Sequence, residues 1–292
     1  MQPNHSNTGK KLTTISSFIC NTRALFLGAA ILASATSLPN AVALAEGEGG
    51  EEITTGAFTF SGNVTIASDY RFRGISQTEN NFALQGGFDL SHDSGFYIGT
   101  WASNLAGWGT FGGANTELDL YGGYATEVSG VSLDGGIIWY VFPAGLDNTS
   151  YGEFYASVGK SFAGIDLTVG TNYAFSQSAL SQDGVNQDNI YVYADGGYSF
   201  NSFPLSLTTH IGYSDGNSGQ GPNGWVASPT GTFVDWSVGL SYPLKGTPLE
   251  FAVTYVDTDI GEEEAAEFAL INPGFRFGIG AATAFFSISA SF

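Results

Sequence analysis

Residues 57–72, which read AFTFSGNVTIASDYRF, alternate between two kinds of side chain. The even positions are mostly apolar or aromatic, and the odd positions are mostly hydroxyl, amide or charged. Successive side chains of a β-strand point to opposite faces, so a period of two indicates a strand rather than a helix. We therefore expect a strand from Ala57 to Phe72 with one face for an apolar environment and the other for water.

The same alternation recurs along the rest of the chain, each time bounded by residues typical of turns. Further strands are expected at about residues 82–90, 96–103, 117–124, 131–141, 153–158, 165–175, 190–195, 205–211, 234–240, 249–255 and 284–292. Together with the first strand, this pattern predicts about twelve strands.

The composition, with many apolar and few charged residues, fits strands in which every second side chain faces lipid. The 292 residues are 43% hydrophobic and only 12% charged, whereas soluble domains carry roughly 25% charged residues. Beyond residue 45 no apolar run reaches the roughly 18 residues of a membrane-spanning helix. The many aromatic residues argue against a disordered acidic chain. The net charge of -19 argues against a nucleic-acid partner, because it repels phosphate.

The connections between the expected strands alternate in length. Short turns are expected at 92–95, 129–130, 163–164, 201–204 and 245–248, and longer loops at 74–81, 104–115, 143–150, 176–188, 215–232 and 258–277. Short turns at one end and long loops at the other are typical of bacterial outer-membrane barrels. The sequence thus predicts an all-β, transmembrane antiparallel β-barrel with short periplasmic turns and longer extracellular loops. The alternative is a soluble β-sandwich with one wet face.

The N-terminal segment has the features of an export signal. Lys10, Lys11 and Arg23 are the only charged residues before Glu46, and the apolar run 24–38 is too short to span a membrane. Small residues at 41–45 offer two overlapping cleavage sites, so residues 1–45 are interpreted as a cleaved signal peptide rather than an uncleaved amphipathic anchor. We expect residues 46–56 to be a flexible acidic leader and 57–292 to be the barrel, located in the bacterial outer membrane.

Cleavage would also change the chemistry available to the chain. It would remove the single cysteine, Cys20, and with it any disulfide or thiolate metal site. It would remove three basic residues and no acidic ones, leaving a charge of 5 − 27 = −22.

The C-terminal strand ends in Phe292 after apolar residues at alternate positions. This ending resembles the C-terminal signature that the bacterial barrel-assembly machinery reads. It implies that machinery as a partner, together with outer-membrane lipid.

Residues 68–77 (SDYRFRGISQ) resemble the opening motif of the TorF family of putative porins. The resemblance continues at 85–89 (QGGFD) and 95–104 (GFYIGTWASN), and its dense part covers about residues 60–124. Phe82 stands where the family expects a proline. The resemblance implies an outer-membrane channel without an established substrate, and it carries over no binding residues.

The polar face of the strands predicts the lining of a lumen. The pore-lining candidates are Asp69, Arg71, Arg73, Asp89, Glu117, Asp119, Asp134, Asp195 and Asp235, and Glu153, Asp166 and Glu250 share their pattern. Excess carboxylates in a confined pore favour cations. The sequence therefore predicts a porin for passive diffusion of small hydrophilic solutes, cation-preferring or zwitterion-tolerant. Alternatively, the carboxylates only solvate the wall or pair with the arginines.

Arg71 and Arg73 have two interpretations of their own. They form a constriction with Asp69 and Asp89, or they brace the wall as ion pairs. Inward aromatic residues likewise serve as a ligand track or as packing: Tyr97, Trp101, Tyr121, Tyr140, Tyr155, Tyr191 and Tyr193.

Two other classes of function were weighed against the channel. A structural or adhesive barrel would need a plugged lumen and apolar loop tips. A barrel enzyme would depend on His210 near Ser206, Thr208 or Ser214, but no nucleophile elbow or oxyanion motif accompanies it. We expect no catalytic residue, no metal and no cofactor.

Overall fold

A computed structural model describes residues 52–292 apart from 147, 183, 217–229 and 272–274. The signal peptide and most of the acidic leader predicted from the sequence therefore lie outside the described residues.

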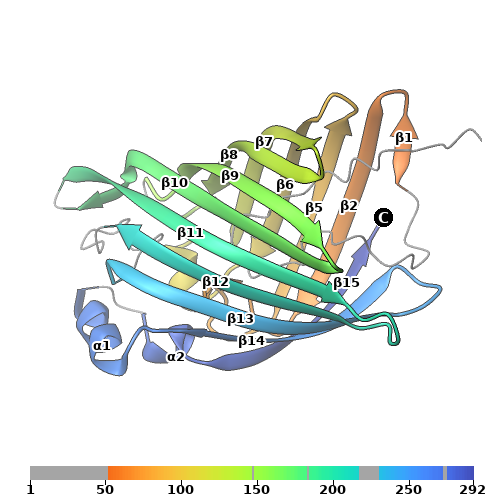
Figure 1. Ribbon diagram of the computed structural model, residues 1–292. Coiled ribbons are helices and arrows are strands. Elements are labelled where there is room, and N and C mark those ends of the chain that lie inside the picture. Colours follow the sequence, from red (N-terminus) through yellow and green to blue (C-terminus); the bar gives the residue numbers. More distant parts are fainter. Residues whose placement is uncertain (1–51, 147, 183, 217–229, 272–274) are drawn as a thin grey trace, which may run out of the picture.

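The strands form one antiparallel ring. Each strand pairs with its neighbour in the chain, and β2 pairs with both β15 and β5, which closes the barrel. The prediction of a twelve-stranded antiparallel barrel is confirmed (Figure 1). The ring consists of β2 (Phe58–Ala67), β5 (Ala83–His92), β6 (Phe96–Asn104), β7 (Thr116–Val128), β8 (Val131–Val141), β9 (Tyr151–Phe162), β10 (Ile165–Gln182), β11 (Val185–Ser199), β12 (Ser206–Gly216), β13 (Thr232–Pro243), β14 (Leu249–Thr258) and β15 (Thr283–Ser291).

Few elements lie outside the ring. β1 (Ile53–Thr55), within the expected leader, pairs with the start of β2. β3 (Arg71–Phe72) and β4 (Ile75–Ser76) form a small separate hairpin. The loops contain the 3-10 helix η1 (Gly107–Thr110) and the helices α1 (Glu262–Ile271) and α2 (Phe277–Gly280). In the described part of the chain, no helix has the length and apolar character to cross a membrane.

Burial follows the alternation along each strand. On β9, Phe154 and Val158 are 53% and 51% exposed, whereas Tyr151, Glu153 and Tyr155 are buried. The other strands repeat this pattern, so one face of the ring is an apolar outer surface and the other lines the lumen. An outer apolar face with a polar interior is the arrangement of transmembrane barrels.

The two ends of the barrel differ as the sequence predicted. The short turns lie at the same end as β1 and the C-terminus, on the right in Figure 1, while α1 and α2 lie at the opposite end. At the two-residue turns Ser129–Gly130 and Ala163–Gly164, both residues have positive φ, from 53° to 82°. That conformation matches the twist of a tight hairpin. We refer to these ends as the turn end and the loop end.

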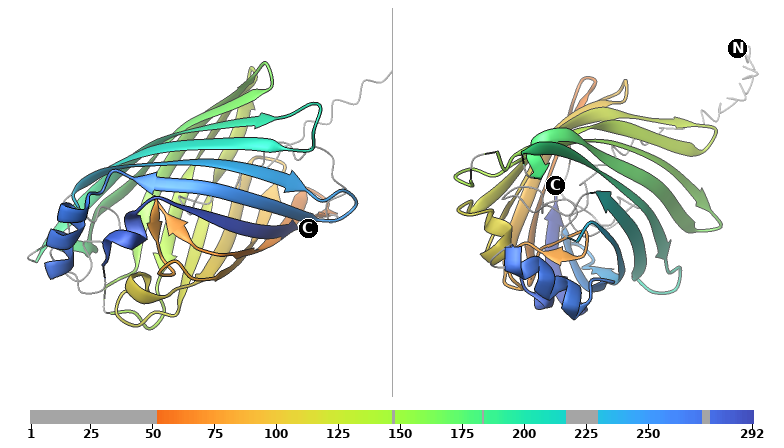
Figure 2. Two further views of the ribbon diagram at one scale, coloured as in Figure 1. Left: turned by 90° about the horizontal axis from the view of Figure 1, so that it is seen from below. Right: turned by 90° about the vertical axis from the view of Figure 1, so that its left-hand side faces the viewer.

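The expected first strand is too long by five residues. β2 ends at Ala67, and Tyr70 and Phe72, which alternation placed on the outer face, are 1% and 6% exposed inside the barrel. Residues 68–82 instead turn into the lumen, where β3 and β4 lie inside the ring beside the helices (Figure 2, right). The carboxylate of Asp69 causes this turn by binding three side chains of the same segment: Arg71, Ser76 and Thr78. We call residues 68–82 the lumen hairpin.

Two of the expected loops are also structured. The loop predicted at 176–188 is wrong, because β10 and β11 continue as a hairpin to Gln182 and Val185. Backbone pairing persists there through two register shifts, at which the side-chain alternation breaks. The loop predicted at 258–277 contains α1 and the start of α2.

Inward-facing tyrosines pack over glycines of adjacent strands. A β-carbon at any of these glycines would overlap the tyrosine ring or hydroxyl, so glycine is needed for the close approach. The pairs are Tyr97 over Gly123, Tyr121 over Gly99, Tyr155 over Gly136, Tyr191 over Gly212 and Tyr193 over Gly170. This packing places the rings against the wall instead of across the lumen.

We expect arginine to be tolerated on the inner face but not on the outer face. Val169→Arg places a charge in hydrocarbon, and an arginine near the bilayer midplane costs about 2–4 kcal/mol of unfolding free energy. Thr168→Arg, one residue earlier on β10 and facing the lumen, is the matched control and should cost much less. Urea unfolding of barrels refolded into lipid vesicles measures both, and equal losses would contradict the assignment of the two faces.

We expect Gly170→Ala to destabilise the barrel by about 1–3 kcal/mol, the usual range for overpacking. The three heavy atoms nearest to the added methyl all belong to the Tyr193 side chain. In a Tyr193→Ala background the glycine substitution should therefore cost little, giving a clear coupling energy in a double-mutant cycle. The same cost in both backgrounds would show that the tyrosine is not the constraint.

Candidate functional site: the barrel lumen

The lumen hairpin is held in shape by one buried ion pair. The Arg71 Nε donates to Asp69 Oδ2 at 2.5 Å, and its Nη1 donates to the carbonyl oxygens of Gly74 and Ile279 at 3.0 and 2.6 Å. The Arg71 Nη2 donates to Asn80 Oδ1 at 2.5 Å. Arg71 therefore ties the two ends of the hairpin together and fastens it to α2.

Aromatic contacts dock the hairpin on the inner wall. The Tyr70 ring meets Trp101 of β6 edge-on at 5.4 Å, and Phe72 meets Tyr140 of β8 at 5.8 Å. The Tyr70 hydroxyl donates to both carboxylate oxygens of Glu117, each at 3.1 Å. These rings and Glu117 are buried, so side chains fill the lumen at this level.

Arg73 binds the neighbouring part of the wall, at β9 and β11. Its Nη2 donates to both carboxylate oxygens of Glu153 on β9 at 2.8 Å, and its Nη1 donates to Asn189 Oδ1 on β11 at 3.2 Å. The guanidinium carbon lies 4.3 Å from the Tyr191 ring centroid and 4.9 Å from that of Phe72. Both rings are within the range of cation–π attraction.

Among the described acidic residues of the inner wall, those near the turn end are accessible to water and those near the hairpin are buried. Near the hairpin, Glu117, Asp119, Glu153 and Asp235 are at most 3% exposed. Nearer the turns, Asp89, Asp134, Asp195 and Glu250 are all partly exposed to the lumen. We call this water-accessible part of the lumen the vestibule.

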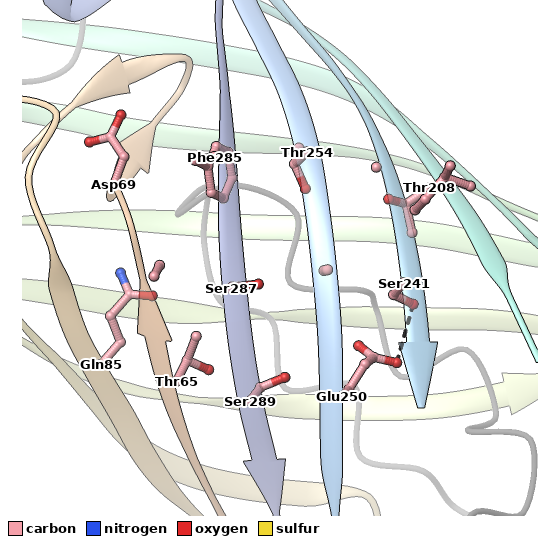
Figure 3. A pocket seen from close by; sticks show the side chains of 14 residues that line it. Thr65, Asp69, Gln85, Thr208, Ser241, Glu250, Thr254, Phe285, Ser287 and Ser289 are labelled. Carbon is pink, nitrogen blue, oxygen red and sulfur yellow. Dashed lines mark hydrogen bonds between the residues drawn. The ribbon is translucent and has the colours of Figure 1, made fainter. Parts of the chain in front are cut away.

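One side of the vestibule is lined by hydroxyl and amide groups. A cavity of about 40 Å³ lies between the walls formed by β2, β5 and β12 to β15. Figure 3 shows the side chains that line it on these strands, with Asp69 of the hairpin at the end farthest from Ser289 and Glu250. Glu250 accepts a hydrogen bond from the Ser241 hydroxyl at 3.2 Å.

The other side of the vestibule combines carboxylates with tyrosines. The Tyr121 hydroxyl donates to Asp89 at 2.6 Å, and the Tyr97 hydroxyl donates to Asp134 at 2.8 Å. The second oxygen of Asp134 makes no hydrogen bond to the described residues. The inward tyrosines Tyr97 and Tyr121 thus orient carboxylates. This role differs from both functions predicted from the sequence, which were packing and a ligand track.

His210 lies between two carboxylates. Its Nδ1 is 2.6 Å from Asp195 Oδ1, and its Nε2 is 3.2 Å from Asp235 Oδ1 and 2.7 Å from the Tyr191 hydroxyl. The neighbours of this histidine predicted from the sequence were Ser206, Thr208 and Ser214. Its partners in the structure are acidic residues of β11 and β13, because the alternation within a strand does not show which residues of neighbouring strands face each other.

The nine predicted pore-lining residues all lie inside the barrel, but in three groups. Asp69, Arg71 and Arg73 belong to the lumen hairpin, Asp89, Asp134 and Asp195 to the vestibule, and Glu117, Asp119 and Asp235 to the buried wall near the hairpin. The predicted constriction of both arginines with Asp69 and Asp89 does not form, because Arg73 pairs with Glu153 and Asp89 with Tyr121. The geometry of both arginines fits the bracing interpretation.

Sequence reasoning missed how the hairpin meets the wall. In the sequence, Glu153 is one of many acidic positions on the polar faces of the strands, and no pattern marks Tyr70 or Asn189 as contact residues between the hairpin and the wall. Turn-forming residues at Ser68, Asp69 and Gly74 were the available signal that the strand ends early.

The fold resembles that of solved porins. A structure of the NanC porin superimposes with a TM-score of 0.51 at 11% identity, covering 80% of this chain and 98% of that one. The KdgM porin in complex with disordered oligogalacturonate gives 0.48 at 9% identity, covering 80% and 98%. An outer membrane channel from Pseudomonas putida F1 gives 0.44 at 9% identity, covering 82% and 96%. At such identities the likeness shows a porin-like barrel and no more.

Comparison by sequence gives a family. No curated protein matches the chain. The model of one family matches residues 51–292, which include the whole barrel. The resemblance to the TorF family of putative porins is not shown by these comparisons and stays a prediction. The chain belongs to the family described as "Bacterial protein of unknown function (Gcw_chp)".

Proposed function

We propose that the protein is an outer-membrane channel for passive diffusion of small hydrophilic solutes, with a preference for cations and tolerance of zwitterions. The observation that carries this proposal is the row of partly exposed carboxylates in the vestibule, Asp89, Asp134, Asp195 and Glu250. An aqueous space with an acidic wall concentrates cations and repels anions.

The distribution of basic groups strengthens the proposal. Arg71 and Arg73 are buried in ion pairs with Asp69 and Glu153, so neither offsets the vestibule charge. Lys160 belongs to the exposed outer face of β9, and Lys245 and Arg276 lie in connections outside the lumen. His210 is the remaining basic side chain that faces inward among the described residues, and it is flanked by Asp195 and Asp235.

The size of the barrel limits the solute. Eight-stranded barrels are filled by side chains and barrels of 16 to 18 strands hold an aqueous channel, so twelve strands give a narrow lumen. The lumen hairpin narrows it further. We place the barrel in the outer membrane, in contact with lipid along its apolar face, and assembled by the barrel-assembly machinery through the strand ending in Phe292.

Neutralising the vestibule should lower cation preference. A carboxylate about 10 Å from a permeating ion contributes about 0.4 kcal/mol in water, so removing three charges should reduce the cation-to-anion permeability ratio several-fold. The variant is Asp89→Asn, Asp134→Asn and Asp195→Asn together, and the measurement is the reversal potential in a KCl gradient across a planar bilayer.

A matched control keeps the charge change but moves it out of the lumen. Glu262→Gln, Glu263→Gln and Glu264→Gln remove three exposed carboxylates from α1 at the loop end. This control should leave the reversal potential close to that of the wild type. Anion selectivity of the wild-type protein would contradict the proposed function.

The buried hairpin favours a second candidate, a structural or adhesive barrel with a plugged lumen. Leu270 on α1 is 84% exposed at the loop end, as a contact surface would require. Single-channel recording separates the two functions. Pure, folded protein without conductance steps, both as wild type and with residues 70–78 replaced by a short glycine–serine linker, would support the plugged barrel.

A further inference from the structure

The contacts of Arg73 differ in kind from those of Arg71. The polar partners of Arg71 belong to the lumen hairpin and the α2 region, so Arg71 maintains the shape of the plug. Within the described residues, the side-chain hydrogen bonds of Arg73 go to side chains of the barrel wall, Glu153 and Asn189. Arg73 is therefore bound by the wall as a ligand is bound, while the hairpin has its own means of folding.

The wall groups around Arg73 are held in place by other wall groups. Glu153 Oε2 accepts from the Tyr140 hydroxyl at 3.1 Å and from the Asn172 amide at 3.2 Å. Asn189 donates to the Ser214 hydroxyl at 3.2 Å and the Asp215 carbonyl at 2.9 Å, which turns its amide oxygen toward the guanidinium. These bonds join β8, β9 and β10 in one set and β11 and β12 in another, and they do not involve the hairpin, so the site is preorganised without its occupant.

The chemistry of the site is that of a guanidinium receptor. Both oxygens of a carboxylate accept from one terminal nitrogen, an amide oxygen accepts from the other, and the Tyr191 ring, 4.3 Å away, faces the planar cation. A strongly hydrated ammonium uses such a flat, partly aromatic site less well than a guanidinium does. Glu153 and Tyr191 are at most 1% exposed, which strengthens both the ion pair and the cation–π contact.

Arg73 does not use all of the polar groups buried near the hairpin. Among the described residues its own Nε has no hydrogen-bond partner, and neither has Asp119 Oδ1, which belongs to a side chain only 2% exposed. Glu117, Asp119 and Glu153 are all buried near the hairpin, and the guanidinium of Arg73 pairs with Glu153, which leaves two carboxyl groups without a basic partner in the described part of the chain. The wall therefore has further capacity for a cation that brings more donors.

We propose that the inner wall at β8, β9 and β11 is a binding site for small organic cations with a guanidinium group, and that Arg73 is its resident ligand when the lumen is closed. A guanidinium-bearing solute that enters this site replaces Arg73 and releases the lumen hairpin from this part of the wall. Passage of that solute rests on the proposed channel function, whereas the binding site itself does not.

Binding to a variant that lacks the resident ligand tests the site directly. Arg73→Gly should open a cavity for methylguanidinium, whose binding to the folded barrel in detergent is measured by calorimetry. Adding Glu153→Gln should weaken that binding about tenfold or more, because loss of one partner of a buried charge pair removes most of its interaction. Arg276→Gly removes an exposed arginine outside the lumen and should create no methylguanidinium site.

The same proteins in a planar bilayer test the consequence for conduction. Arg73→Gly should pass more current than the wild type, and methylguanidinium should alter that current only while Glu153 is present. If Arg73→Gly does not fold, Arg73→Asn serves in both measurements, because asparagine tolerates the positive φ of residue 73 and its short side chain leaves the guanidinium position empty.

The two measurements separate the two proposals. Folded Arg73→Gly and Arg73→Asn proteins that bind no methylguanidinium, or bind it equally well without Glu153, would overturn the site whatever their currents. Glu153-dependent binding without current from any variant would support the site and overturn the channel. Equal binding of methylammonium and methylguanidinium would overturn the assignment to guanidinium groups.

Discussion

The structure depends on one constraint, which is that every backbone amide and carbonyl within hydrocarbon needs a partner inside the protein. A single extended sheet meets this requirement only when its first strand pairs with its last. Here the pairing of β2 with β15 closes the ring, and hydrogen bonds between Gly62 and Phe292 extend the seam to the final residue. Once the ring is closed, each strand side chain faces either the outside of the barrel or the lumen, which explains the alternation of the sequence.

Closure creates a second problem, because twelve strands enclose more space than wall side chains fill. The protein solves it differently at its two ends. At the turn end, tyrosines pack flat over glycines and leave a wet, acidic vestibule. At the loop end, the lumen hairpin enters the barrel and buries its own charges against partners. The carboxylates of the vestibule therefore face water, whereas Asp69 and Glu153 in the other half are paired with guanidinium groups.

The lumen hairpin also connects the proposed function with the proposed guanidinium site. Its two arginines divide the work, since Arg71 holds the hairpin together and Arg73 attaches it to Glu153. A channel that binds its own arginine in this way uses one set of wall groups for closure and for recognition. The same carboxylate serves both purposes because, when buried, it needs a cationic partner both with Arg73 in the site and with a solute in its place.

The sequence by itself determined the fold class, the number of barrel strands, the direction of most side chains and the acidic character of the interior. It did so because a strand with a period of two records its two environments locally, residue by residue. Only the tertiary structure decided that the segment after Ala67 leaves the wall, that β10 and β11 continue past the expected loop, and that Arg73 meets Glu153 rather than Asp69 or Asp89. Arg73 and Glu153 are 80 positions apart, and the segment after Ala67 leaves the wall through contacts among its own side chains. The extension of β10 and β11 depends on backbone pairing that persists through two register shifts. Alternation predicts to which face of the sheet a side chain points, but its contacts across the lumen depend on how the closed ring brings distant strands together.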